Sequence, residues 1–327
     1  MKVLLPYTEE MAITMQQMLG ENVTVVRSER TAESMIEHGA DADVVISGRV
    51  PGDYIRAAKK LKLIHAMGAG IDKIDRSAVL ERGDVVVCNV HENAAEVAEY
   101  AVTLLFAAAK NIVVNDREFR KGDWTYGFGG PRPNVELRGK TCLLVGLGNI
   151  GVEIASRLRS FGMKLTAVNR TGHSPNRNVV DRLESIDNIV PLVQEADFII
   201  LALPLTEDSY ELVDEDLISS MKPTALLVNI SRGEVIEEKA LYDALKDKRI
   251  LGAGLDVWWN YPQWGVAEIR FPSKLPFHEL DNLVMSPHRA AYSANTTRAH
   301  LQFIVDNILR FIGGEELHNI VDMKIGY

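Results

Sequence analysis

Short apolar runs alternate with segments of helical periodicity along the whole chain of 327 residues. Aliphatic and β-branched residues dominate the runs, and polar or glycine-containing stretches separate one run from the next. This alternation is typical of βαβ units, in which helices connect parallel strands and cover the faces of the sheet. The pattern therefore predicts an α/β protein with parallel sheets.

The predicted strands form two series. The first series is expected at Lys2–Pro6, Val23–Arg27, Asp43–Ser47, Lys62–Ala66 and Val85–Asn89. The second is expected at Thr141–Val145, Lys164–Val168, Phe198–Ala202, Ala225–Ile230, Gly252–Val257 and Leu283–Ser286. Because a domain usually holds roughly 150 residues, we expect two doubly wound parallel-sheet domains.

A long helix is predicted between the two series. Asn93 is placed to cap it, and Glu96 stands three residues further on, as in a capping box. We expect this helix to end near Asn111, the stretch Asp116–Pro133 to be irregular, and the domain boundary to lie within or just before the helix. A final amphipathic helix, closed by Gly313 and Gly314, need not belong to the second domain.

Composition and charge exclude several classes of protein. Hydrophobic residues make up 46% and charged residues 25%, which is ordinary for a globular chain. The net charge is −9 and no Lys/Arg-rich run occurs, so we expect neither nucleic acid nor a membrane as a partner. The apolar runs are too short for a membrane span, which favours a cytoplasmic location. Cys88 and Cys142 lie in apolar runs and are expected to be reduced and buried, and no metal site is predicted.

A glycine-rich motif follows the first strand of the second series. Gly146, Gly148 and Gly151 form a G-x-G-x-x-G pattern that opens a helix. The first glycine permits a tight turn, the second lets backbone N–H groups approach a pyrophosphate, and the third lets the helix pack closely on the strand. Strand, motif, helix and second strand together predict a dinucleotide site.

The end of the next strand bears on the choice of cofactor. An NAD site usually has an acidic residue there, whereas this chain has Asn169 followed by Arg170. A neutral amide does not repel a 2′-phosphate, and a guanidinium binds one, so NADP(H) is the preferred cofactor. NAD(H) remains the alternative, with Arg170 then a solvated loop residue.

Three polar segments follow later strands, at the edge where open α/β sheets bind ligands. They are Ser231–Gly233, Asp256–Pro262 and Ser286–Arg289. With these segments the chain resembles the D-2-hydroxyacid dehydrogenases, the family of phosphoglycerate, glyoxylate/hydroxypyruvate, D-lactate and formate dehydrogenases. The motifs that carry the resemblance are Met67–Asp72, Asn93–Glu99, Leu137–Thr141, Gly146–Gly151, Asn229–Gly233, Leu255–Val257 and Ser286–His288.

The resemblance implies a Rossmann dinucleotide-binding domain inserted into a flavodoxin-like substrate domain. The substrate domain would comprise residues 1–98 and 290–327, and the NAD(P)-binding domain residues 99–289. Family members are commonly homodimers joined through their dinucleotide domains, so a homodimer is expected here, with apolar surface offered by the Asn93 helix and Asp116–Pro133.

The resemblance also implies roles for individual residues. His288 would exchange a proton with the substrate oxygen, and Arg232 would polarise that oxygen and bind the carboxylate together with backbone N–H groups of Gly68, Ala69 and Gly70. Asp256 resembles the residue that contacts the nicotinamide carboxamide. The implied cofactor contacts are Gly146, Gly148, Asn149, Ile150, Gly151, Asn169, Arg170, Thr171, Leu203, Pro204, Ile230, Ser231, Arg232, Asp256 and His288.

Position 261 departs from the family pattern. The family has Glu, or Gln in formate dehydrogenases, where this chain has Tyr261. A carboxylate beside histidine raises the histidine pKa, whereas a phenol can only hydrogen-bond. Another partner for His288 would have to come from the longer loop, where the candidates are Gln263, Glu268 and Glu279. The neighbouring aromatic residues, Trp258, Trp259 and Trp264, either pack or line a pocket.

The sequence thus predicts an oxidoreductase that transfers a hydride between NADP(H) or NAD(H) and a small 2-hydroxy or 2-keto acid, acting as a 2-ketoacid reductase. Two alternatives stay open. The first is a dinucleotide-binding regulatory protein on the same fold, like the family's corepressor relatives, which the missing acid at Tyr261 favours. The second is a formate dehydrogenase, which needs no proton relay but would be expected to carry Gln at that position.

Overall fold

The computed structural model describes residues 1–262, 268–293 and 295–327. The chain folds into two compact units, one formed by Met1–Asn93 with Tyr292–Tyr327 and the other by Ala94–Ala291. The second unit is therefore inserted into the first. Its boundaries lie at 93/94 and 291/292, whereas the sequence predicted 98/99 and 289/290.

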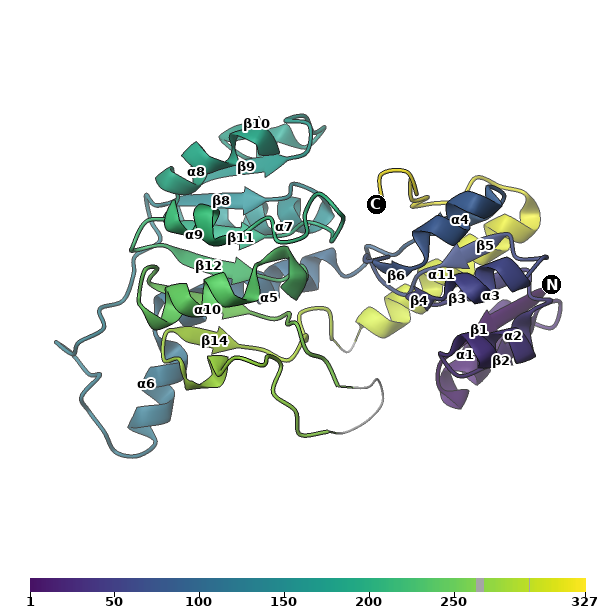
Figure 1. The fold of residues 1–327 in the computed structure, drawn as a ribbon, viewed down its shortest axis with the longest axis horizontal. Helices are drawn as coiled ribbons and strands as arrows, with labels where there is room; N and C mark the ends of the chain where they lie inside the picture. Colours follow the sequence, from purple (N-terminus) through teal and green to yellow (C-terminus); the bar gives the residue numbers. More distant parts are fainter. Residues whose placement is uncertain (263–267, 294) are drawn as a thin grey trace. The chain divides into compact units, whose positions relative to one another are not determined.

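The first unit is built on a five-stranded parallel sheet in the order β2-β1-β3-β5-β7 (Figure 1). Alternate residues of β1 face opposite sides: Val3 and Leu5 pack with α1 and α11, while Leu4 packs with α2, α3 and α4. The strands are β1 (Lys2–Leu5), β2 (Thr24–Arg27), β3 (Val44–Ile46), β5 (Leu63–His65) and β7 (Val86–Cys88), with a separate pair β4 (Arg49–Val50) and β6 (Lys73–Ile74). The helices are α1 (Glu9–Leu19), α2 (Ala32–Gly39), α3 (Gly52–Ala57), α4 (Arg76–Arg82) and α11 (Thr296–Gly313).

The second unit contains a seven-stranded parallel sheet in the order β10-β9-β8-β11-β12-β13-β14. Cys142 and Leu144 of β8 face α5 and α7, whereas Leu143 and Val145 face α8, α9 and α10, which lie in front of the sheet in Figure 1. The strands are β8 (Thr141–Val145), β9 (Lys164–Asn169), β10 (Arg182–Ser185), β11 (Phe198–Leu201), β12 (Leu226–Asn229), β13 (Gly252–Leu255) and β14 (Leu283–Met285). The helices are α5 (Ala94–Ala109), α6 (Ile112–Phe119), α7 (Asn149–Arg159), α8 (Ile189–Glu195), α9 (Glu215–Ser219) and α10 (Glu238–Lys246).

Both strand orders match the predicted fold class. The order in the first unit is that of flavodoxin-like sheets, and the order in the second is that of the Rossmann fold with one further strand. In the second sheet β9 and β10 lie on one side of β8 and β11 to β14 on the other, so the strand order reverses between β8 and β11 and creates a switch point at their carboxyl ends. Ligands of open α/β sheets bind at such a point.

The short strands β4, β6 and β10 were not predicted. Two-residue strands carry no periodicity, and β10 contains a single apolar residue, Leu183, so hydrophobic alternation gives no signal there. Most other predicted strands differ from the observed bounds by one or two residues at an end.

The helix between the two series also differs from the prediction. It ends at Ala109, and Asn111 adopts a left-handed backbone (φ 52°) that breaks it, so α6 occupies part of the stretch predicted to be irregular. The side-chain oxygen of Asn93 is buried and has no hydrogen-bond partner in the described part of the chain, so the predicted cap is not formed. Among the described helices none alone is long and apolar enough to cross a membrane; α5 and α6 pass that test only as a pair bent by 60°.

Candidate active site

The glycine motif lies at the switch point of the second sheet. Gly146 has a φ of 106°, and a Cβ added to it would lie 2.3 Å from the carbonyl oxygen of Ala202, which follows β11. A Cβ on Gly151 would lie 2.3 Å from the oxygen of Gly146. A Cβ on Gly148, the residue before α7, would meet nothing within 4 Å. The motif therefore packs tightly against β11 while leaving the N-terminus of α7 open to an anion.

The predicted cofactor residues around this motif lie at the same end of the sheet. Asn149 and Ile150 begin α7, and Leu203 and Pro204 follow β11. The hydroxyl of Ser209 donates to the carbonyl of Pro204 at 2.7 Å, which fixes the turn after β11. These residues and the glycine loop come together as the sequence predicted, through two adjacent strand ends.

Asn169 organises the loop that follows β9. Its side-chain oxygen accepts from the backbone N–H of Gly172 at 2.7 Å and of Thr171 at 3.2 Å, and its amide donates to the carbonyl of His173 at 2.8 Å. The Asn169 side chain is thus used within its own loop, a role that the sequence interpretation missed. Arg170 projects from this ordered loop and is exposed.

A buried asparagine holds the segment that carries Arg232. The side chain of Asn229 is fully buried; its oxygen accepts from the N–H and hydroxyl of Ser231 at 2.9 and 2.7 Å, and its amide donates to the carbonyl of Arg232 at 2.8 Å. A Cβ on Gly233 would lie 2.3 Å from the carbonyl oxygen of Trp258, so this loop packs against the one after β13. The motif Asn229–Gly233 gives no role to Asn229 itself, although a polar residue that ends a buried strand is a signal for such a role.

Asp256 holds the loop that carries His288. It is 1% exposed, and its carboxylate accepts hydrogen bonds from the hydroxyl of Ser286 and from the N–H groups of Arg289 and Ala290, the latter two at 2.8 Å each. His288 lies within this clamped segment and adopts a left-handed backbone with φ 55°. Such a backbone costs about 1 kcal/mol or more in a non-glycine residue, and the contacts on either side maintain it.

Tyr261 lies beside His288, with ring centroids 5.5 Å apart. Its hydroxyl accepts from the backbone N–H of Trp258 at 3.1 Å. Burial raises the pKa of Tyr261 to about 12, although the Trp258 N–H and the charge of Arg232 oppose that rise. Tyr261 is therefore a neutral phenol near physiological pH, beside the ring of His288.

The other predicted partners for His288 either have ion-pair neighbours of their own or fall outside the described residues. Glu268 forms an ion pair with Arg270 at 2.9 Å, and Glu279 lies 3.9 Å from His278. Gln263 and Trp264 fall in the part of the chain that the structure does not describe. Trp258 and Trp259 pack in the core with Phe277, which favours a packing role for these two aromatic residues.

In the first unit, the loop of Gly68, Ala69 and Gly70 follows β5. The carbonyl of Gly68 accepts from the N–H of Val90 at 3.2 Å, and the carbonyl of Ala69 accepts from the side chain of Asn89 at 2.9 Å. In a trans peptide the C=O and the following N–H point in opposite directions. The N–H groups of Ala69 and Gly70 therefore point away from Val90 and Asn89, as an anion-binding loop requires.

The family model described as D-isomer specific 2-hydroxyacid dehydrogenase, NAD binding domain, matches residues 102–290. D-3-phosphoglycerate dehydrogenase of Methanocaldococcus jannaschii is 35% identical over 322 residues, which are 96% of this chain and 58% of that protein. This chain therefore spans little more than half the length of that relative. Glyoxylate reductase of Korarchaeum cryptofilum is 32% identical over 300 residues, which are 89% of this chain and 86% of that enzyme.

Two solved structures have similar folds over nearly the whole chain. An acyclic imino acid reductase in complex with NADPH and D-Arg has a TM-score of 0.84 at 27% identity and covers 98% of this chain and 100% of its own. The NADPH-dependent glyoxylate/hydroxypyruvate reductase of Sinorhizobium meliloti, in complex with NADP and malonate, has a TM-score of 0.83 at 27% identity, with coverage of 99% and 97%.

Proposed function

The chain belongs to the D-isomer-specific 2-hydroxyacid dehydrogenase family and is an NAD(P)-dependent oxidoreductase, and from this premise we propose that it reduces a small 2-keto acid to the 2-hydroxy acid. The observation that carries the proposal is the clamp of Asp256 on the loop of His288, beside Tyr261 and near Arg232. The clamp holds His288, the proposed proton donor, at the carboxyl-end edge of the sheet, where we propose that the dinucleotide binds.

We assign the proton transfer to His288 and the binding of the substrate carboxylate to Arg232. His288 gives its proton to the ketone oxygen, and the guanidinium polarises that oxygen, which lowers the energy of the charge that develops on it. Bound nicotinamide supplies the hydride.

The second unit is the proposed dinucleotide domain, and the first is the proposed substrate domain. The open N-terminus of α7 after Gly148 fits a pyrophosphate, and Asp256, Ile230 and Ser231 lie at the same edge of the sheet, where the nicotinamide half would bind. Exposed Arg170 suits a 2′-phosphate, which favours NADP(H) over NAD(H). NADPH and NADP in the two similar solved structures support that preference.

The substrate proposal is tested with glyoxylate, hydroxypyruvate, pyruvate and phenylpyruvate, each with NADPH and with NADH. Steady turnover that is lost in Arg232→Ala and in His288→Asn, but kept in the surface control His278→Ala, would support it. Dinucleotide binding without any turnover would favour a dinucleotide-binding regulatory protein. Oxidation of formate would favour a formate dehydrogenase. Adding ammonia to the keto acids tests imino acids, because one of the similar structures is an acyclic imino acid reductase.

We also propose that the protein works in the cytoplasm as a homodimer. Apolar side chains on α6 and in the segment that follows it are exposed in the single chain: Ile112, Val113, Phe119, Trp124 and Phe128. Because these exposed apolar side chains follow one another along a short segment, they favour burial against a second copy of this chain.

A further inference from the structure

The hydroxyl of Tyr100 on α5 makes a hydrogen bond that the proposed chemistry does not yet use. It lies 2.7 Å from the hydroxyl of Ser286, a residue that is 5% exposed. Ser286 directly follows β14 and stands two residues before His288. A bond between residues 186 positions apart in the chain therefore ends next to the proposed proton donor.

The direction of this hydrogen bond follows from counting protons. The hydroxyl of Ser286 has one proton, and it donates that proton to the carboxylate of Asp256. Its remaining capacity is as an acceptor, so the hydroxyl of Tyr100 must be the donor. The chain of bonds runs from Tyr100 to Ser286 to Asp256, with each donor proton used once.

Asp256 extends the chain to the backbone around His288. The oxygen that accepts from Ser286 also accepts from the N–H of Arg289, and the second oxygen accepts from the N–H of Ala290. The indole of Trp258 donates to the carbonyl of Ser286 at 2.8 Å, which fixes the serine from its other side. The left-handed backbone of His288 is thus bracketed by Ser286 before it and by two clamped N–H groups after it.

We infer that Tyr100 is a positioning residue for His288. Its hydroxyl holds Ser286 and, through it, the Asp256 carboxylate in the orientation that keeps the His288 backbone in its left-handed conformation. The inference rests on the proposed role of His288 as proton donor. In a buried network a lost donor leaves its acceptor unsatisfied, so the loss of one hydroxyl changes the geometry of the whole chain of bonds.

The variant Tyr100→Phe removes the hydroxyl and keeps the ring. We expect kcat for keto-acid reduction to fall about three- to tenfold, the scale of one buried hydrogen bond, while the melting temperature stays close to wild type. The solvent deuterium isotope effect on kcat should rise, because a misplaced imidazole makes proton transfer a larger part of the rate limit. Amide exchange at Arg289 and Ala290 should become faster.

Two further variants sharpen the test. Tyr242→Phe removes a hydroxyl from another partly buried tyrosine of the same unit and is the matched control. It should change neither kcat, nor the solvent isotope effect, nor amide exchange at Arg289 and Ala290. Ser286→Ala should reduce kcat at least as much as Tyr100→Phe. Adding Tyr100→Phe to Ser286→Ala should cause no further loss, because the first change has already broken the chain of bonds.

The possible failures can be separated. If His288→Asn is as active as wild type, the proposed function of His288 is wrong. If His288 is required but Tyr100→Phe matches Tyr242→Phe in rate, isotope effect and exchange, the inference about Tyr100 is overturned. A fall in melting temperature with unchanged kcat and isotope effect would show a merely structural role and would also overturn it. Amide exchange at Arg289 and Ala290 needs no substrate, so it tests separately whether Tyr100 stabilises the hydrogen bonds from these N–H groups to Asp256.

Discussion

At the scale of single residues, the neutral phenol of Tyr261 beside His288 determines how the proposed reduction responds to pH. Reduction needs the imidazolium form, so kcat/KM falls as pH rises through the histidine pKa. The Tyr261 pKa of about 12 keeps this neighbour uncharged through that range. A carboxylate at position 261 would instead stabilise imidazolium.

We therefore expect Tyr261→Glu to carry fast reduction to higher pH, by about one unit or more, the usual effect of a carboxylate in contact with histidine. The measurement is the pH profile of kcat/KM for a 2-keto acid, which stays ionised throughout. Tyr261→Gln, which adds no charge, is the control. A profile that is flat to high pH in wild type and unchanged in Tyr261→Glu would mean that another acid already partners His288.

Arg170 is the residue proposed to read the 2′-phosphate. Arg170→Ala should weaken NADP(H) binding by about 1–3 kcal/mol and change NAD(H) binding little, because only one cofactor carries that charge. Binding titrations with NADP(H) and NAD(H) check this. Arg177→Ala, at an exposed arginine that begins the short 3-10 helix Arg177–Val179, is the control. Equal losses for both cofactors would remove Arg170 from phosphate recognition.

Asn169→Asp is a less clean route to NAD(H) preference. The amide of Asn169 donates to the carbonyl of His173 at 2.8 Å, and a carboxylate there would place two oxygens against each other. The loop would open as well as change charge. Cofactor preference is therefore better probed at Arg170, because replacing its exposed side chain keeps the hydrogen bonds that Asn169 makes to Thr171 and Gly172.

At the scale of elements, the glycine motif before α7 combines two separate requirements. Gly146→Ala should lower the melting temperature, because a Cβ at a φ of 106° would collide with the backbone of Ala202. Gly148→Ala should leave the melting temperature near wild type and weaken dinucleotide binding at least tenfold, because its Cβ enters open space at the helix N-terminus. Thermal melts and cofactor titrations distinguish the two variants. Equal melting temperatures for Gly146→Ala and Gly148→Ala would contradict this account.

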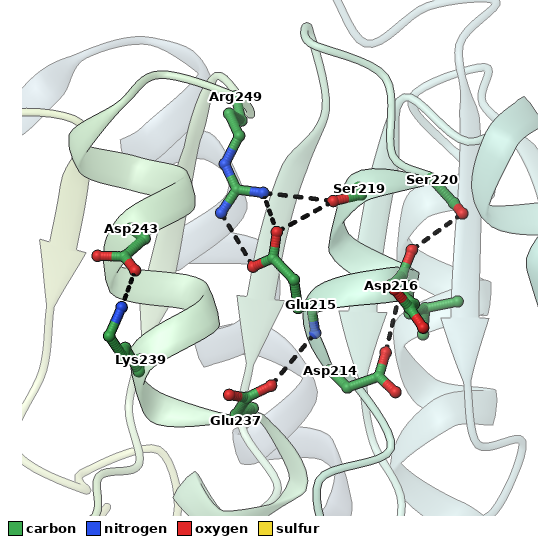
Figure 2. Close-up of polar contacts among 10 residues, drawn as sticks. Asp214, Glu215, Asp216, Ser219, Ser220, Glu237, Lys239, Asp243 and Arg249 are labelled. Atoms are coloured by element: carbon green, nitrogen blue, oxygen red, sulfur yellow. Dashed lines mark hydrogen bonds and ion pairs between the residues drawn. The ribbon is translucent and has the colours of Figure 1, made fainter.

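The short helix α9 begins at an N-cap residue, Asp214, which is drawn in Figure 2. Asp214 accepts from the N–H of Leu217 at 2.9 Å, and Leu217 is buried in the core beneath. Asp214→Ala should lower the free energy of unfolding by about 1 kcal/mol, the typical value of an N-cap. In the same view Lys239 pairs with Asp243 on the exposed side of α10, so Lys239→Ala should leave the unfolding midpoint unchanged. Denaturant unfolding compares the two, and equal losses would show that the cap is not what holds α9.

At the scale of the whole molecule, the proposed homodimer would bury the apolar side chains of α6 and of the segment after it. Light scattering at micromolar concentration should give twice the mass of one chain. Phe119→Asp should shift the protein toward monomer, because Phe119 is 56% exposed in the single chain and would be desolvated in a dimer. Ile13→Asp on α1, at similar exposure, is the control. A monomer in wild type would refute the proposal.

The two sheets, most of their strands and the dinucleotide motif follow from the amino-acid sequence alone. Hydrophobic alternation, glycine spacing and polar residues after strands are local signals, because side-chain periodicity and backbone sterics act over a few residues. Polar residues after strands also marked the segments that contain Arg232, Tyr261 and His288, while the resemblance to the family gave these residues their expected roles. The local signals gave nothing for β4, β6 and β10, whose pairing depends on neighbouring strands more than on their own residues.

The hydrogen bonds that hold the site together are long-range contacts that the sequence does not show. The clamp of Asp256 on Ser286 joins residues 30 positions apart, and the bond from Tyr100 spans 186 positions. Such pairs meet because strand order brings β13, β14 and α5 together, and no local pattern encodes which polar groups then satisfy one another. Buried hydrogen bonds must be complete wherever the fold places them, and here that requirement sets the conformation of His288.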